Sequence, residues 1–145
     1  MTRAVPIAFA LALLAGCFQP GTREVLQDEV RNYHDALRWR RFGEAALHLP
    51  PARRPGFLDR AAKVAEDVQI ADYEIRQVAQ LSETRVEIHA ALEWESRRTG
   101  LVRKTELAEL WERKGSDWIL VETRQLGGEK LPFFDATPVG AAAEK

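Results

Sequence analysis

Apolar residues recur along this chain with two different periods. In the first half they stand three or four positions apart, as at Leu26, Val30, Tyr33 and Leu37. That spacing places them on one face of a helix, so it predicts an amphipathic helix over residues 23–41 that packs against a core. In the second half, apolar and polar residues alternate instead, which is the pattern of strands with one buried face.

Capping residues and prolines set the expected helix boundaries. Thr22 precedes the long helix and belongs to a residue type that favours the N-cap. A second, short helix is expected through Ala45-Ala46-Leu47, and Pro50-Pro51 ends it because proline lacks the backbone donor. Residues 55–66 carry the apolar content of a third short helix.

Four strands are expected after the helices. The first covers residues 67–80, where the alternation changes phase near Ala71-Asp72 and therefore predicts a bulge or bend. The second, from Val86 to Trp94, has the cleanest alternation in the chain, with charged residues and a histidine at the intervening positions. Its apolar face is expected to be buried.

The third and fourth strands are predicted over residues 101–113 and 118–125, with a turn at Gly115-Ser116-Asp117 between them. The fourth begins with Trp118 to Val121, a run that is apolar on both faces and therefore predicts a central place in the sheet. We expect Leu131 to Phe134 to fold back onto the sheet. From Thr137 onward the tail is expected to be disordered.

Helices followed by consecutive antiparallel strands define an α+β fold, with N-terminal helices packed on a curved four-stranded antiparallel sheet. The length suffices for one domain with its own core. We place this domain at residues 23–127 and a partly disordered C-terminal tail at residues 128–145.

Residues 1–16 follow a separate pattern. Arg3 is followed by the apolar stretch from Ala4 to Leu14, and the small residues Ala15 and Gly16 stand directly before Cys17. This order is typical of a secretory signal peptide. The apolar stretch is shorter than the roughly 20 residues that a membrane-spanning helix needs. The segment Leu14-Ala15-Gly16-Cys17 resembles a bacterial lipobox.

The lipobox resemblance implies a lipid anchor at Cys17. Residues 1–16 would be removed, the Cys17 sulfur would carry a diacylglyceryl group, and the new α-amino group would be acylated. Residues 17–22 would form a lipidated tether, and several acyl chains hold a protein on a bilayer far more firmly than one. Phe18, where an aspartate would resemble an inner-membrane retention signal, favours the outer membrane of a bacterial cell envelope, facing the periplasm.

Composition and spacing exclude several kinds of site. Cys17 is the only cysteine, so one chain contains neither a disulfide nor a cysteine-ligated metal. With 21 basic and 22 acidic residues the chain is close to neutral, which argues against nucleic acid as a partner. His34, His48 and His89 lack the spacing of metal ligands, so no metal and no cofactor are expected.

The last two strands carry a second resemblance. Leu107 to Arg113 places an aromatic residue in a strand, Gly115 opens a turn, and Trp118 to Val121 begins the next strand. Together with the long first helix, this order resembles the nuclear transport factor 2-like superfamily, which includes ketosteroid isomerases. The resemblance implies a cone with a cavity between the first helix and the concave side of the sheet. A cystatin-like arrangement is the alternative fold.

The implied cavity makes certain residues at apolar positions candidates for lining it: Tyr33, Trp39, Trp94, Glu109 and Trp111. Glu109 shares a strand face with Trp111, and Glu122 shares one with Trp118, so either carboxyl group can point inward. His34 and Asp35 are expected on the surface, because consecutive helix residues point in different directions.

Two classes of function remain open, beside a purely structural envelope protein with no pocket. The first is a membrane-anchored binding module without catalysis, whose partner is an envelope protein or a small apolar ligand, and which can pair as a homodimer through its sheet. The alternative is a small isomerase or hydrolase in which Glu109 acts as base inside an apolar cavity. Six arginines lie near the short helices: Arg38, Arg40, Arg41, Arg53, Arg54 and Arg60. We expect them to form a solvated, salt-bridged face rather than a site for anionic lipid headgroups or cell-wall polymers.

Overall fold

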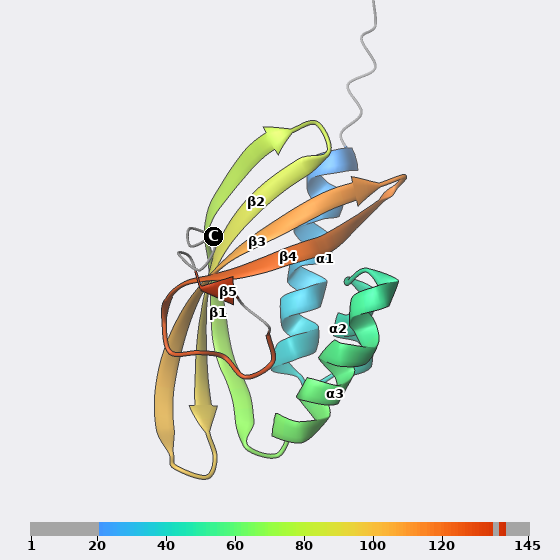
Figure 1. The fold of residues 1–145 in the computed structure, drawn as a ribbon. Helices are drawn as coiled ribbons and strands as arrows, with labels where there is room; N and C mark the ends of the chain where they lie inside the picture. The colour runs from blue at the N-terminus through green and yellow to red at the C-terminus, as the bar shows by residue number, and fades with distance from the viewer. Residues whose placement is uncertain (1–20, 135–136, 139–145) are drawn as a thin grey trace, which may run out of the picture.

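The computed structural model describes residues 21–134 and 137–138 (Figure 1). Helices come first and are followed by a sheet whose strands lie in chain order, β1-β2-β3-β4-β5. The elements are α1 (Gly21–Arg38), α2 (Phe42–Leu47), the 3₁₀ helix η1 (Pro51–Arg53), α3 (Arg54–Val64), β1 (Val68–Ser82), β2 (Arg85–Ser96), β3 (Leu101–Lys114), β4 (Asp117–Gly128) and β5 (Thr137–Pro138). The predicted α+β arrangement, with four long antiparallel strands, is confirmed. Among these described residues, no helix has the length and apolar content needed to cross a membrane.

Helix α1 packs its apolar stripe against the rest of the domain. Leu26, Val30, Tyr33 and Leu37 are all at most 5% exposed, which confirms the predicted amphipathic helix. The helix already includes Gly21, so Thr22 lies in the first turn and the prediction that it is the N-cap is wrong. Helix α1 contacts β1 and β4 as well as α2, so it is covered from more than one side.

The C-terminus of α1 comes earlier than predicted because the chain adopts a left-handed turn. The helix ends at Arg38, and Arg40 has a φ of 60°. The backbone N–H of Arg40 donates to the Leu37 carbonyl at 3.2 Å, and the backbone N–H of Arg41 donates to the Ala36 carbonyl at 2.8 Å. This pair of bonds is the Schellman motif, which satisfies carbonyl groups that the helix end would leave unpaired.

Arginine side chains fix the short helices to the backbone around them. Arg53 Nη1 donates to the Val121 carbonyl at 2.6 Å, and Arg54 Nε donates to the Leu49 carbonyl at 3.0 Å. Both side chains are only half exposed. Among the described residues, these two arginines are thus held by backbone carbonyls, and not by the salt bridges of the expected solvated face.

The alternation of apolar and polar residues predicts the buried face correctly throughout β2 but only in part of β1. In β2, buried positions alternate with half-buried ones from Val86 to Trp94, as predicted. In β1 the register shifts between Ile70 and Asp72, which confirms the predicted bulge, and it shifts again between Ile75 and Gln77. The second shift was not predicted, and it changes which residues of β1 face α1.

Strand β4 corrects two predictions. It pairs with β3 on one side and only with the two-residue β5 on the other, so it is not a central strand. Trp118 and Leu120 are buried, but a register shift at Val121 reverses the phase of the strand. The Glu122 side chain is therefore 53% exposed, and Thr123 is buried in its place.

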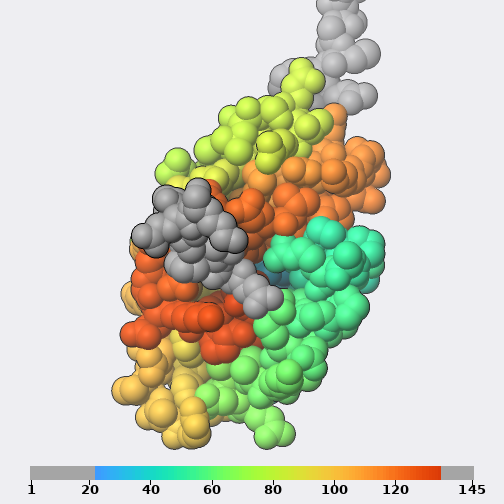
Figure 2. All heavy atoms as spheres, in the orientation of Figure 1, coloured from blue at the N-terminus to red at the C-terminus, as the bar shows by residue number. Residues whose placement is uncertain are grey.

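The segment after β4 completes the core. Leu131, Phe133 and Phe134 are buried, which confirms that this segment folds back. The Phe133 ring lies 5.4 Å from the Phe42 ring, and Arg60 Nε donates to the Phe133 carbonyl at 3.2 Å. Figure 2 shows this red segment against the green helices. Strand β5 lies within the expected tail and pairs with β4. The predicted signal peptide and Cys17 fall outside the described residues.

Two tryptophans test this packing. Trp111 is 0% exposed and Trp39 is 66% exposed. We expect Trp111→Ala to lower the free energy of unfolding by about 3–5 kcal/mol, because it leaves a cavity in the core. Trp39→Ala is the matched control, with an expected change within ~0.5 kcal/mol. Urea denaturation followed by circular dichroism measures both, and equal effects would contradict the assigned burial.

Candidate functional site

A buried acid–base pair joins α1 to the sheet. Glu109 lies on β3 with 0% exposure, and His34 lies on α1 with 1%. His34 Nε2 is 3.2 Å from each Glu109 carboxyl oxygen, and Trp111 Nε1 donates to Oε2 at 3.2 Å. Burying a polar group costs free energy unless the group is hydrogen-bonded. The contacts from His34 and Trp111 therefore explain how the Glu109 carboxyl group can lie in the interior.

Tyr33 lies beside this pair without a hydrogen bond. Its ring packs edge-on against the rings of His34, His48 and Trp111, at centroid distances of 5.2, 5.9 and 5.8 Å. The Tyr33 hydroxyl, His34 Nδ1 and Glu109 Oε1 are buried and have no hydrogen-bond partner of suitable geometry among the described residues. The interior thus contains both a donor and acceptors that remain unused.

The prediction that His34 is a surface residue is wrong. Consecutive helix residues do point in different directions, but α1 is covered on more than one side. Tyr33 faces the His48 ring beyond α2, whereas His34 stacks on Tyr73 of β1 at a centroid distance of 4.8 Å. Asp35, also expected on the surface, accepts a hydrogen bond from the Tyr73 hydroxyl at 3.1 Å.

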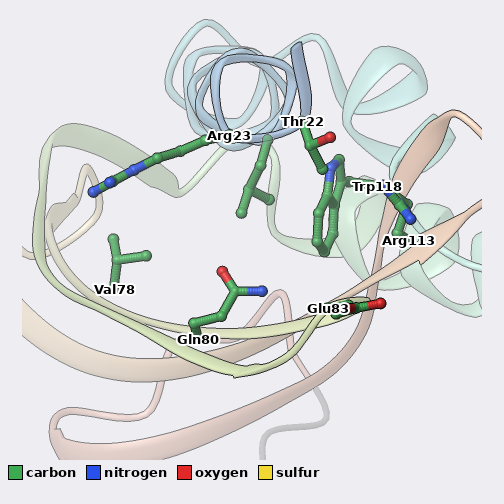
Figure 3. Close-up of a pocket in the computed structure, with 8 residues that line it drawn as sticks. Thr22, Arg23, Val78, Gln80, Glu83, Arg113 and Trp118 are labelled. Carbon is green, nitrogen blue, oxygen red and sulfur yellow. The ribbon is translucent and has the colours of Figure 1, made fainter. Parts of the chain in front are cut away.

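An open groove lies between the N-terminal half of α1 and the sheet, and it has two adjoining lobes. The apolar lobe has a volume of about 320 Å³ and is lined by Arg23, Leu26, Gln27, Val30, Arg31, Tyr73, Ile75, Val78 and Ile88. The polar lobe has a volume of about 470 Å³ and is lined by Thr22, Arg23, Leu26, Val78, Gln80, Glu83, Arg113 and Trp118. Three residues line both lobes, so the lobes form one groove. In Figure 3, Arg23 extends from α1 across the opening, and Gln80 points into it from the sheet.

The groove ends close to the buried pair but does not include it. Tyr73 lines the apolar lobe with one part of its ring and stacks on His34. Ile88, which also lines this lobe, is the register partner of Glu109 on the neighbouring strand. Tyr73 and Ile88 therefore lie between the groove and the acid–base pair.

The five predicted lining residues separate into three groups. Tyr33, Glu109 and Trp111 come together in the interior. Trp94 is buried elsewhere in the core, where its Nε1 donates to Thr105 Oγ1 at 2.9 Å. Trp39 lies on the surface beneath the Arg38 guanidinium and does not face the interior.

None of these five residues lines either lobe of the groove. Of the residues that line it on the sheet, Ile75 follows the predicted bulge in β1, whereas Val78 follows the unpredicted register shift between Ile75 and Gln77. Several lining residues had a signal in the sequence: Leu26 and Val30 belong to the apolar stripe of α1, Ile88 to the alternation of β2, and Trp118 to the apolar run that begins β4.

The convex face of the sheet carries charge. Glu87 contacts His89 at 2.9 Å and Arg124 at 2.6 Å, and Arg124 also lies 3.4 Å from Glu122. The hydrogen bond from His89, together with Arg124, lowers the pKa of Glu87 below its ordinary value of 4.5. This face is ion-paired rather than apolar, and the homodimer through the sheet stays a prediction.

The described residues contain no group of three or more His, Cys, Asp and Glu side chains that could hold a metal ion. His48 Nδ1 contacts Glu29 at 2.8 Å, as a pair and not as part of such a group. Burial lowers the pKa of His48 below its ordinary value of 6.5, although Glu29 opposes that shift.

Comparisons with known proteins place the fold. No family model matches the chain, and no curated protein matches its sequence. A ketosteroid isomerase-like protein from Erwinia carotovora atroseptica has a similar structure, with a TM-score of 0.57, 18% identity, and coverage of 76% of this chain and 99% of that one. A SEC-C motif containing protein from Rhodopseudomonas palustris reaches a TM-score of 0.59 at 13% identity, covering 68% of this chain and 77% of that one.

At these identities the likeness concerns the fold alone. The chain has an α+β fold like that of the ketosteroid isomerase-like protein, with helices followed by a four-stranded antiparallel sheet, as expected from the sequence. Proteins with different descriptions share this architecture, so the fold does not choose a function.

The two tyrosines allow a direct test of the interior. Burial, with a contribution from Glu109, raises the pKa of Tyr33 well above 10.0, and burial with the Asp35 hydrogen bond raises the pKa of Tyr73 to about 12. Because both folded values exceed the unfolded value, the stabilisation is complete below about pH 10 and is lost as pH rises through the folded values.

We expect tyrosinate absorbance to appear only above about pH 11 and together with the loss of circular dichroism. Spectrophotometric titration of the folded chain, with a parallel titration in urea, measures this. A tyrosinate signal near pH 10 in a fully folded sample would show that one of the rings is open to solvent.

Proposed function

We propose that this chain is a lipid-anchored protein of the bacterial cell envelope whose groove binds a small apolar ligand without catalysis. The observation that carries this proposal is the contrast between two features. The groove is open and has an apolar lobe, whereas His34 and Glu109 are at most 1% exposed. A ligand can reach the first without any rearrangement, but not the second.

The size and lining of the groove support binding. Small-molecule sites have volumes of about 300–1,000 Å³, are mainly apolar, and carry a few polar groups that orient the ligand. The apolar lobe, at about 320 Å³, lies within this range. Ile75 and Val78 are 37% and 53% exposed, so apolar surface at the groove remains available to a ligand. Covering such surface contributes roughly 25 cal/mol per Å².

The anchor rests on the lipobox resemblance at Leu14 to Cys17. Gly21, the first residue of α1, follows Cys17 by four residues. An extended chain covers about 3.3–3.6 Å per residue, so the end of α1 that lines the groove would lie within roughly 14 Å of the lipidated residue. The groove would then open near the membrane surface.

A second candidate function is a small isomerase or hydrolase with Glu109 as base. One observation favours it: the Tyr33 hydroxyl and Glu109 Oε1 are both buried, and neither has a hydrogen-bond partner of suitable geometry among the described residues. Unused polar atoms in an apolar interior suit proton transfer to a bound substrate. However, a substrate would have to displace Tyr73 or Ile88 to reach Glu109.

Binding of the neutral fluorescent probe N-phenyl-1-naphthylamine distinguishes these functions. We expect Val78→Asn to weaken binding about fivefold, because about 1 kcal/mol of apolar contact is lost. Val102→Asn is the matched control, since Val102 is 60% exposed and lies outside both lobes. Glu109→Gln is expected to leave binding unchanged. Loss of binding in Glu109→Gln, with Val78→Asn unaffected, would move the site to the interior.

The anchor is tested separately by Cys17→Ser. This change removes the thiol to which the diacylglyceryl group would attach, so we expect the protein to leave the membrane fraction. Fractionation of cells that produce either form, followed by immunoblotting, measures the distribution. Unchanged membrane association of Cys17→Ser would refute the lipid anchor without affecting the ligand-binding proposal.

A further inference from the structure

We propose that the groove binds a single-chain amphiphile with an anionic head group, drawn from the membrane lipids beside the anchor. This inference rests on the proposed function, because it names the class of ligand for the same groove. It follows from the different character of the two lobes and from the charge at their junction.

The apolar lobe fits a hydrocarbon chain. Its aliphatic lining is Leu26 and Val30 from α1 and Ile75, Val78 and Ile88 from the sheet. These side chains face one another across the groove, so a chain between them would have apolar contacts on both sides. Leu26 and Val78 also line the polar lobe, so a bound chain could continue into it without crossing a polar barrier.

Positive charge at the junction fits an anionic head group. Arg23 lines both lobes, and no acidic group lies within 4 Å of its guanidinium in the described part of the chain. Arg31 lines the apolar lobe and has only an exposed partner, Asp28, at 3.6 Å. Arg113 lines the polar lobe and forms no ion pair among residues 21–134. Against these three arginines the lining contains one acidic residue, Glu83, so its formal charge is positive.

Polar groups in the polar lobe add hydrogen-bonding capacity. The Gln80 side chain points into the lobe from β1 (Figure 3), and its Nε2 donates one hydrogen bond to the Ser82 carbonyl, which leaves the second N–H for a ligand. Trp118, 2% exposed, lines the same lobe, and its Nε1 has no hydrogen-bond acceptor in the described residues. Head-group oxygens are acceptors, and arginine binds carboxylate or phosphate with two parallel hydrogen bonds.

Two other occupants fit less well. The acyl chains on Cys17 itself would reach the groove, but a triacylated cysteine has no anionic group to place against Arg23. A neutral apolar molecule would fill the apolar lobe and leave the arginines unused. The position of the groove beside the tether favours a ligand that enters from the bilayer.

The experiment compares 11-(dansylamino)undecanoic acid with its methyl ester, which has the same chain and fluorophore but no negative charge. The protein is the full chain carrying Cys17→Ser, so that no attached acyl chain competes. We expect the acid to bind about tenfold more tightly than the ester, because hydrogen bonds to a charged group are the stronger kind. This preference should decrease as ionic strength rises.

Arg23→Gln is expected to remove most of the preference for the acid and to leave the affinity for the ester unchanged. Arg23 is exposed, and circular dichroism verifies that the variant is folded. Arg98→Gln, at an exposed arginine in the turn between β2 and β3, is the matched control and should change neither affinity.

Each outcome has a distinct meaning. Equal binding of acid and ester overturns the anionic head group, while the proposed binding of an apolar ligand stands. Failure of both probes to bind overturns the proposed function as well. A preference for the acid that survives in Arg23→Gln places the head group elsewhere and overturns this inference.

Discussion

The position of α1 on the sheet depends on the contact between His34 and Glu109. It joins the C-terminal half of the helix to the middle of β3, and both side chains are almost completely buried. Taking such groups out of water costs several kcal/mol, so any displacement of the helix that separates them is strongly disfavoured. A slide of α1 along the sheet would disturb the apolar packing and would also separate this pair. The pair therefore helps to fix the register of the helix.

That register determines where the domain is filled and where it is open. Near His34 the space between helix and sheet is occupied by Tyr33, Trp111 and Tyr73. Toward the N-terminus of α1 the register shifts in β1 direct Ile75 and Val78 toward the helix, where they do not close the gap. The groove is thus the continuation of the same interface beyond the last large aromatic side chains.

The sequence predicted those features that depend on local periodicity. The stripe of α1 and the alternation of β2 were both confirmed, since each is a repeat over several turns or residue pairs. The face of Glu109 was confirmed for the same reason. Glu122 was a different case, because a single extra residue at Val121 reverses all later positions of β4 and no composition signal marks it.

The burial of His34 could not be predicted from α1 either. A helix with a single buried face would bury Tyr33 and leave the adjacent His34 exposed. Both are buried here because α1 is contacted from two different directions. Those contacts come from Tyr73 and His48, which are distant in sequence. The candidate site was therefore predicted in part. The interior residues Tyr33, Glu109 and Trp111 came from the pattern, whereas the groove also depends on the register shift between Ile75 and Gln77, which the pattern does not specify.

The separation of groove and acid–base pair bears on how this fold changes its function. In a cone of helix and sheet, one cavity can hold both a polar group for chemistry and apolar walls for binding. Here large aromatic side chains occupy the deep part, so the polar pair has become an internal contact and the remaining space lies at the mouth. Tyr73, which lines the groove and stacks on His34, and Ile88, which pairs with Glu109, are the side chains that separate the two regions. On this scaffold, the presence of a buried carboxyl group does not by itself distinguish a binding module from a cavity enzyme. The distinction depends on the volume of the few side chains between the groove and the carboxyl group.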